Sequence, residues 1–241
     1  MSDKHRIGVV LLSGGLDSTT CLYTAAAATP AYDEMHAVSI NYGQRHLKET
    51  DYAKKSCKKI GVSHHMLDNP SIFPKSMLTD TNVAVPDISY GDIQGVSPTY
   101  VPFRNGTMLA LLTAFTEGII ENAKRDLNME GIVDVEADIY FGAHAEDAAN
   151  WAYPDCTPEF IGAMANAIYI GSYRRIRLCT PLQWMNKRQI IEHGQRLGVK
   201  WEDTWSCYKG LEKQCGTCPT CRSRREGFEL AHVQDPTEYA A

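Results

Sequence analysis

The sequence has no excess of positive charge. Its 24 lysine and arginine residues are outnumbered by 29 aspartate and glutamate residues, so the formal net charge is -5 and the isoelectric point is about 5.9. Proteins that bind the phosphate backbone of a polynucleotide usually present a basic surface. The charge balance therefore disfavours a nucleic-acid partner, and we expect small-molecule ligands instead.

The sequence also lacks a long apolar run near its start. The first such run, Ile7 to Leu12, is too short for a signal peptide or a membrane span. We therefore expect a cytoplasmic protein with no membrane partner. In a protein of that kind, the eight cysteines indicate metal ligands and buried thiols rather than a disulfide scaffold.

No internal repeat or low-complexity tract is present, and apolar strands alternate with amphipathic helices along the chain. This alternation predicts an α/β fold in which a parallel sheet, built through right-handed crossovers, carries helices on both faces. The expected strands are residues 7–12, 35–40, 64–67, 138–142 and 177–180, and the expected helices are residues 17–29, 44–60, 105–120, 157–170 and 186–197.

Two stretches interrupt this alternation. Residues 68–103 contain five prolines and no sustained periodicity, which is typical of a lid or substrate-binding loop. The charged stretch from Asn122 to Ala137 is expected to be a surface insertion. We expect residues 1–200 to form one nucleotide-binding domain and residues 201–241 to form a metal-binding C-terminal region.

A glycine turn joins the first expected strand to the first expected helix. Its glycines let the backbone curl around an oxyanion, and the free amides of a helix N-terminus supply positive potential. Neither G-K-[ST] nor G-x-G-x-x-G is present, so the turn is not a Walker loop or a Rossmann fingerprint. The predicted nucleotide-binding residues of the turn are Leu11, Leu12, Ser13, Gly14, Gly15, Leu16, Asp17, Ser18 and Thr19.

Asp17 is the acidic member of this turn. A carboxylate repels phosphate unless a divalent cation joins them, so Asp17 is assigned to Mg²⁺ binding or to turn geometry. The alternative is an ordinary strand-to-helix turn in which Ser13 is a helix cap. The motif S-G-G-x-D-S after an apolar strand resembles the pyrophosphate loop of the N-type ATP pyrophosphatases, the PP-loop superfamily. This resemblance implies ATP cleavage between the α and β phosphates.

Four cysteines cluster near the C-terminus with the spacing C-x7-C-x2-C-x2-C, at Cys207, Cys215, Cys218 and Cys221. Four thiolates at this spacing fill a tetrahedral Zn²⁺ shell with no open position, which predicts a structural zinc knuckle. An iron–sulfur cluster and unliganded buried thiols are the alternatives. Arginines 222, 224 and 225 follow the cluster, and such a run is typical of a solvated helix face.

Four further segments are N-Y-G-Q-R-H from Asn41, T-Y-V-P-F-R-N from Thr99, H-A-E-D with A-Y-P-D-C from His144, and T-W-S-C-Y from Thr204. Together with the turn and the cysteines they resemble the 7-cyano-7-deazaguanine synthase (QueC) family over nearly the whole chain. The resemblance implies a five-stranded α/β domain, zinc and a homodimer. It also implies conversion of 7-carboxy-7-deazaguanine and ammonia to the nitrile with two ATP, through an adenylated acid and an adenylated amide.

Three cations are candidates for stabilising the charge that develops as pyrophosphate leaves. Arg104 lies where a proline-bounded loop enters a helix, and Lys187 opens a later helix. Arg45 is the weaker third candidate. For each of them the alternative is a surface salt bridge.

A guanine-like base presents two adjacent donors that one carboxylate can accept, and Asp155 fits that task. Tyr153 or Trp151 is a candidate to stack on the base, although a lone aromatic side chain more often serves packing. The residues predicted to bind Mg²⁺ or orient ammonia are His144, Glu146 and Asp147; the alternative for Asp147 is a turn cap.

The sequence departs from the family pattern at Phe103, at Thr157 and in the stretch from Asn122 to Ala137. These departures leave open a relative that stops at the amide or joins the acid to another amine. A tRNA-modifying thiolase would need a reactive cysteine, for which Cys156 is the candidate. A zinc-knuckle nucleic-acid adaptor is the alternative from outside the enzymes, and the complete S-G-G-L-D-S turn argues against it.

Overall fold

The sheet of this protein has five strands, all parallel, in the order β3-β2-β1-β4-β5. The strands are β1 (His5–Leu11), β2 (Glu34–Asn41), β3 (Ser63–Asp68), β4 (Val135–Tyr140) and β5 (Ile176–Cys179). The structure is a computed structural model. It describes residues 4–45, 47–69, 72–73, 76–80, 82–132 and 134–240.

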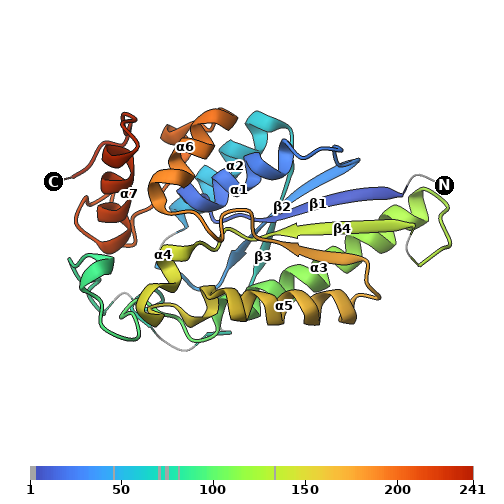
Figure 1. Cartoon of the computed structure of the whole chain (residues 1–241), viewed down its shortest axis with the longest axis horizontal. Coiled ribbons are helices and arrows are strands. Elements are labelled where there is room, and N and C mark those ends of the chain that lie inside the picture. Colours follow the sequence, from blue (N-terminus) through green and yellow to red (C-terminus); the bar gives the residue numbers. More distant parts are fainter. Residues whose placement is uncertain are drawn as a thin grey trace.

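Helices cover both faces of the sheet, as the sequence predicts (Figure 1). One face carries α1 (Leu16–Ala26), α2 (Lys48–Ile60) and α6 (Lys187–Leu197), and the other carries α3 (Arg104–Asp126) and α5 (Pro158–Gly171). The short α4 (Ala145–Ala148) follows β4, and α7 (Pro219–Leu230) packs against α6. Single turns of 3₁₀ helix lie at Tyr90–Asp92, Ala149–Trp151, Pro154–Cys156 and Trp201–Asp203.

The two faces of β1 belong to two separate cores. Ile7 and Val9 pack with α3 and α5, whereas Val10 packs with α1, α2 and α6. All three side chains are fully buried. A strand covered on both sides has no polar face, which explains why the sequence of β1 is a continuous apolar run.

The stretch from Asn122 to Ala137 is not a surface insertion, so that prediction is wrong. Helix α3 continues through its first part to Asp126, and β4 begins at Val135. Ala123 and Val135 are buried. The charged residues Glu121, Arg125 and Asp126 near the end of α3 face solvent while its apolar face stays on the sheet, so the charge marks an amphipathic helix rather than an insertion.

Other boundaries move by a few residues. Helix α2 begins at Lys48 rather than Gln44 because the preceding residues form a tight turn, in which the Gln44 side chain accepts a hydrogen bond from the Tyr42 amide at 2.9 Å. Within the described part of residues 68–103, the only helical segment is the turn at Tyr90–Asp92. Helix α7 was not predicted as an element.

The glycine turn lies at the carboxyl edge of the sheet, where β1 ends between β2 and β4. The chain crosses to opposite faces of the sheet on either side of this point, and such a switch point leaves a crevice for ligands. In the view of Figure 1, the turn, α4 and the cysteine-bearing segment with α7 gather at this end of the molecule.

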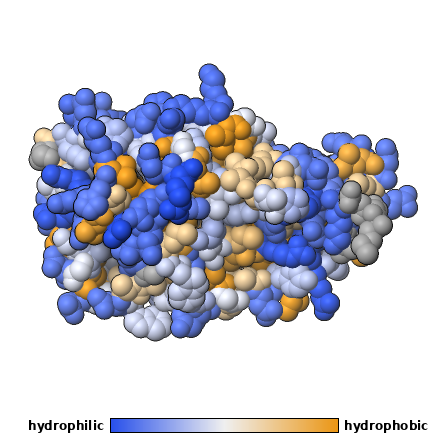
Figure 2. Space-filling view, turned by 45° about the horizontal axis from the view of Figure 1, so that its top comes forward, coloured by the Kyte–Doolittle hydropathy of each residue, from blue (hydrophilic) through white to orange (hydrophobic). Residues whose placement is uncertain are grey.

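Hydrophilic residues predominate on the face shown in Figure 2, with smaller apolar patches between them. Among the helices that the structure describes, none has the length and apolar character needed to cross a membrane.

Candidate active site and metal centre

The glycine turn places the N-terminus of α1 at the crevice. Gly14 has a φ of +90°, and a Cβ added there would lie 2.0 Å from the Glu49 carbonyl oxygen, so glycine is required by both conformation and space. The N-cap of α1 is Gly15, and no side chain caps the helix. The Ser13 hydroxyl instead contacts the Ser18 hydroxyl at 2.9 Å. An uncapped helix N-terminus of this kind suits an anion.

Most of the predicted turn residues line a large cavity beside the turn. Those that do are Leu11, Leu12, Ser13, Gly15, Asp17 and Ser18. Leu16 lines a second, smaller cavity on the other side of the turn. Gly14 and Thr19 line neither cavity, and Thr19 is fully buried in α1.

Asp17 and Lys187 form an ion pair at the start of their helices. The Lys187 ammonium lies 2.7 Å from Asp17 Oδ1 and 3.1 Å from His144 Nε2. Burial alone would raise the pKa of Asp17, but Lys187 and His144 lower it. Burial alone would lower the pKa of Lys187, but the carboxylates of Asp17 and Asp147 raise it. Both groups are therefore charged at neutral pH.

His144 connects this ion pair to α4. Its Nε2 lies 3.3 Å from the Asp147 carboxylate, and its Nδ1 is buried without a hydrogen-bond partner among the described residues. Asp147 lines both cavities. Glu146 is exposed and lines neither. The structure thus brings His144 and Asp147 to the turn and leaves Glu146 at the surface.

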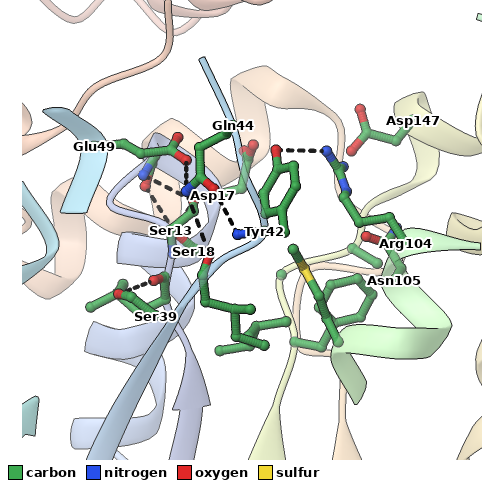
Figure 3. Close-up of a pocket in the computed structure, with 18 of the residues that line it drawn as sticks. Ser13, Asp17, Ser18, Ser39, Tyr42, Gln44, Glu49, Arg104, Asn105 and Asp147 are labelled. Atoms are coloured by element: carbon green, nitrogen blue, oxygen red, sulfur yellow. Dashed lines mark hydrogen bonds between the residues drawn. The ribbon is translucent and has the colours of Figure 1, made fainter. Parts of the chain in front are cut away.

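The far wall of the large cavity comes from α3 and from aromatic side chains (Figure 3). Arg104 donates a hydrogen bond to the Tyr42 hydroxyl at 3.3 Å. Tyr153 is buried in this wall, where its hydroxyl bonds to the hydroxyls of Ser97 and Thr99. The cavity therefore has a polar side at the glycine turn and an aromatic side with one cation, Arg104.

Asp155 lies behind this wall rather than on it. It is 3% exposed, and its Oδ2 accepts the amide of Asn105 at 3.0 Å, which helps to cap α3. Its Oδ1 is buried without a partner among the described residues. Burial raises the pKa of Asp155, and the Asn105 amide and Arg104 oppose the shift.

Two other candidates lie away from the cavities. The Arg45 guanidinium binds the carbonyls of Met77 and Val83 in the lid segment. Trp151 is 67% exposed and lines neither cavity. Arg45 therefore does not reach the cavities in which it was predicted to stabilise pyrophosphate. Trp151 does not reach a position from which it would stack on the base.

The departures from the family pattern also lie outside the cavities. Thr157 is the N-cap of α5, where its hydroxyl accepts the Phe160 amide at 3.3 Å. Phe103 precedes α3 with a φ of +54°, and its exposed ring packs edge-on against Phe160. Both residues are therefore N-cap residues, Thr157 of α5 and Phe103 of α3.

The sequence analysis did not single out Glu49 or Tyr208, which line both cavities, or Gln44, which lines the large one. Gln44 and Tyr208 lie inside motifs that carry the family resemblance, so the sequence could have indicated both as site residues. No motif indicated Glu49, because an acidic residue in the first turn of a helix is usually a solvated charge.

The smaller cavity lies between the turn and the C-terminal segment. Lys187, Ser206, Thr220, Ser223 and Arg224 line it opposite the turn. The hydroxyls of Ser206 and Ser223 have no hydrogen-bond partner in the described part of the chain. This cavity combines two cations, free hydroxyl donors and the amides of α1 with the carboxylates of Asp17, Glu49 and Asp147, which suits a highly charged anion that carries a divalent cation.

The four clustered cysteines are all buried, and their sulfur atoms lie within 4.8 Å of one another. Backbone amides point at two of the sulfurs. The amides of Cys218 and Thr217 lie 3.2 and 3.4 Å from Cys215 Sγ, and the Cys215 amide lies 3.3 Å from Cys207 Sγ. Amide donors stabilise thiolates, so the donor set fits a tetrahedral metal ion.

The metal cluster is tied to the glycine turn. The Trp205 amide, two residues before Cys207, donates to the Gly14 carbonyl at 2.9 Å. Arg224 of α7 holds the same segment through Thr204 Oγ1 and pairs with Asp235 at 2.9 Å. Arg224 is 1% exposed. The interpretation of the arginine run as a solvated face is therefore wrong for Arg224, while Arg222 and Arg225 are exposed.

The strand order, the position of S-G-G-L-D-S at the switch point and the four-cysteine appendage define an α/β protein with the architecture of the PP-loop proteins. A family model described as queuosine biosynthesis protein QueC matches residues 7–232. The chain belongs to this family of synthases, so the resemblance predicted from the sequence is confirmed.

Curated relatives match along nearly their whole length, and each of the following is named 7-cyano-7-deazaguanine synthase. The chain is 42% identical to the relative from Thermoplasma acidophilum, with 98% of this chain and 93% of the relative covered. It is 39% identical to that of Caldicellulosiruptor bescii, with 96% of each covered. Identity to the Pseudoalteromonas atlantica relative is 36%, with 96% and 97% covered.

Proposed function

We propose that this enzyme converts 7-carboxy-7-deazaguanine and ammonia to 7-cyano-7-deazaguanine, with ATP cleaved to AMP and pyrophosphate. The observation that carries the proposal is the uncapped N-terminus of α1, which lies between two cavities of different character. Asp17 lines both cavities and is paired with Lys187. The family relationship supplies the substrate class.

The two cavities suit the two products of ATP cleavage. The larger cavity, with its aromatic wall, has the character needed for the adenylate and the deazaguanine ring. The smaller cavity, with Lys187, Arg224 and free hydroxyls, suits pyrophosphate. The scissile bond would then lie at the turn residues that both cavities share, Ser13, Gly15 and Asp17.

The chemistry explains why ATP is needed twice. A carboxylate resists attack by ammonia, so its oxygen must first join a phosphate that can leave as AMP. The resulting amide is adenylated on its oxygen and loses AMP to form the nitrile. In both rounds charge develops on pyrophosphate, where Lys187 and the amides of α1 would stabilise it. Arg104 would stabilise charge on the adenylate side.

Two metals accompany this proposal. Zinc in the cluster of Cys207, Cys215, Cys218 and Cys221 would be structural, because four thiolates leave no open position. Mg²⁺ would be held by ATP phosphates together with one or two carboxylates, for which Asp17 and Asp147 are the candidates, and would neutralise phosphate charge.

The remaining expectations from the sequence also stand as proposals. These are a cytoplasmic homodimer that uses ammonia, nucleotide binding by residues 1–200, zinc binding by residues 201–241, and no nucleic-acid partner. A tRNA thiolase is the less favourable alternative. Its candidate nucleophile, Cys156, is buried, and burial raises the pKa of its thiol well above the ordinary value, so little reactive thiolate is present.

The proposal is tested by mass spectrometry of the products formed from ATP, ammonium and 7-carboxy-7-deazaguanine. We expect the nitrile, with two AMP and two pyrophosphate for each nitrile. Accumulation of the amide as the end product would identify a relative that stops halfway. Release of ADP and phosphate alone would contradict the proposal.

We expect Asp155→Asn to weaken binding of the deazaguanine substrate at least tenfold. The Oδ1 of Asp155 is buried behind the cavity wall without a partner among the described residues, so it would accept a base donor when the wall in front of it moves aside, and an amide nitrogen in its place would oppose that donor. An unmatched buried polar pair costs on the order of 1–3 kcal/mol. Calorimetric titration with the base and with ATP measures the effect separately, and ATP binding should hardly change.

Asp155 also caps α3, so thermal denaturation of the same variant provides the control. Asparagine caps a helix nearly as well as aspartate, and the melting temperature should stay close to that of the parent. Equal weakening of both ligands would show that Asp155 acts only through the start of α3.

A further inference from the structure

The carboxylates around the large cavity differ in their partners. Asp17 is paired with Lys187 at 2.7 Å, and Asp147 lies 3.3 Å from His144. Asp155 caps α3 behind the wall. Glu49 of α2 forms no ion pair in the described part of the chain, and its single hydrogen bond, from Gln44 Nε2, is long at 3.4 Å. Among the carboxylates that line this cavity, Glu49 is therefore the one that has no ion-pair partner among the described residues.

Glu49 lies where a small co-reactant would meet an adenylated substrate. It lines both cavities, beside the glycine turn, because the Glu49 carbonyl oxygen is packed against Gly14. Figure 3 shows Glu49 and Gln44 on one side of the cavity and Arg104 and Asp147 on the other. A carboxylate on the turn side therefore faces the space in which the reacting carbon would lie.

We propose that Glu49 binds ammonium and accepts its proton, which delivers ammonia to the activated carboxyl carbon. This inference rests on the proposed function. Ammonium is the main form of ammonia at neutral pH and has no free electron pair, so it cannot attack until it loses a proton. An unpaired carboxylate both attracts the cation and takes the proton.

Proton transfer and C–N bond formation together convert ammonium and the adenylated acid to the amide and AMP. Ammonium transfers one proton to the Glu49 carboxylate, which leaves ammonia and a carboxylic acid. The nitrogen electron pair forms the C–N bond, and the C–O bond to AMP breaks with its electrons going to the phosphate oxygen. The second proton that the new amide must lose leaves with AMP, and Glu49 returns its proton to solvent.

The environment of Glu49 sets a proton affinity that suits this role. Burial raises the pKa of Glu49 to about 7, although Arg104 and Gln44 oppose the shift. A base is most effective when its pKa lies near the working pH. The ionisable groups that line the same two cavities are Asp17 of α1, Tyr42, Tyr90, Arg104 of α3, Asp147 of α4, Tyr153, Cys156, Lys187 of α6, Tyr208 and Arg224 of α7.

The test is Glu49→Gln, assayed in two parts. Exchange of labelled pyrophosphate into ATP in the presence of 7-carboxy-7-deazaguanine reports adenylation and needs no ammonia. Amide formation from added ammonium reports the later step. We expect exchange within about threefold of the parent and amide formation reduced at least about 100-fold, the usual contribution of a general base.

The pH profile provides a readout that a structural role would not produce. At constant ammonium concentration, amide formation by the parent should rise and then level off as the pH passes through about 7, because only the ionised Glu49 accepts a proton. In Glu49→Gln this inflection should be absent. High pH, at which most ammonium is already deprotonated in solution, should restore part of the variant's rate.

Asp51→Asn is the matched control, since Asp51 is an exposed acid in the first turn of the same helix. It should behave like the parent in both assays. Loss of exchange in Glu49→Gln would assign Glu49 to ATP or Mg²⁺ binding and overturn the inference, as would an unchanged response to ammonium. Absence of exchange in the parent protein would instead overturn the proposed function.

Discussion

Asp17→Ala is expected to reduce turnover by roughly 100- to 1,000-fold, the usual cost of removing one preorganised electrostatic partner from an active site. Asp17 holds the Lys187 ammonium at 2.7 Å beside the uncapped start of α1. Without the carboxylate, Lys187 shifts toward Asp147, and the phosphate end of ATP loses its proposed Mg²⁺ ligand. Steady-state assay of AMP and pyrophosphate release measures the effect.

Thermal denaturation shows whether the fold survives. Asp17→Asn separates the two roles of the residue, because the amide oxygen can still accept a hydrogen bond from Lys187 but carries no charge. Loss of turnover in both variants, at an unchanged melting temperature, would assign the role to the charge. Asp126→Ala, an exposed acid at the end of α3, should be silent.

The pH dependence of stability gives a second check on Asp17. Its pKa lies below the ordinary value of 3.8, so its ion pair stabilises the native state above that pH and is lost as the pH falls through the lower native value. The parent should therefore lose more stability on acidification below about pH 4 than Asp17→Ala does. Equal acid sensitivity would mean that the ion pair contributes little.

The purified protein is expected to hold about one zinc ion per chain, and Cys218→Ala to lose it together with several kcal/mol of stability. In small metal sites the binding free energy, about 10–16 kcal/mol for zinc-finger peptides, is largely folding free energy. Cys218 is fully buried, so loss of the ion also leaves three thiols facing one another. Elemental analysis and denaturant unfolding measure the two effects.

Cys218→Ala should also lower ATP turnover, although no cysteine of the cluster lines either cavity. The reason is the hydrogen bond from the Trp205 amide to the Gly14 carbonyl, which anchors the glycine turn to the segment that enters the cluster. Cys179→Ala is the control, because Cys179 lies in β5 outside the cluster and should leave metal content unchanged. Iron with visible absorbance, or a stable metal-free protein, would contradict the zinc assignment.

Much of this fold could be predicted from local patterns. The continuous apolar run of β1 indicates a strand buried on both faces, and the glycine turn after it indicates a strand followed by a helix. The spacing of the four cysteines is itself a geometric constraint, because two-residue gaps bring thiolates together. The sequence-based prediction was wrong where charged residues belong to regular or buried elements. It placed the charged end of α3 in a surface insertion, and it placed the buried Arg224 on a solvated helix face.

The sequence by itself determined the α/β class, the glycine turn and the cysteine cluster, because each depends on residues close together in the chain. Only the tertiary structure decided which carboxylates meet in one cavity and what partner each one has. Asp17 and Lys187 are 170 positions apart, and their ion pair depends on packing α1 against α6. Asp155 and Glu49 show the same limit. The Asp155 carboxylate accepts the Asn105 amide behind the cavity wall, and the Glu49 carboxylate forms no ion pair among the described residues, because such pairings depend on distances that no local pattern contains.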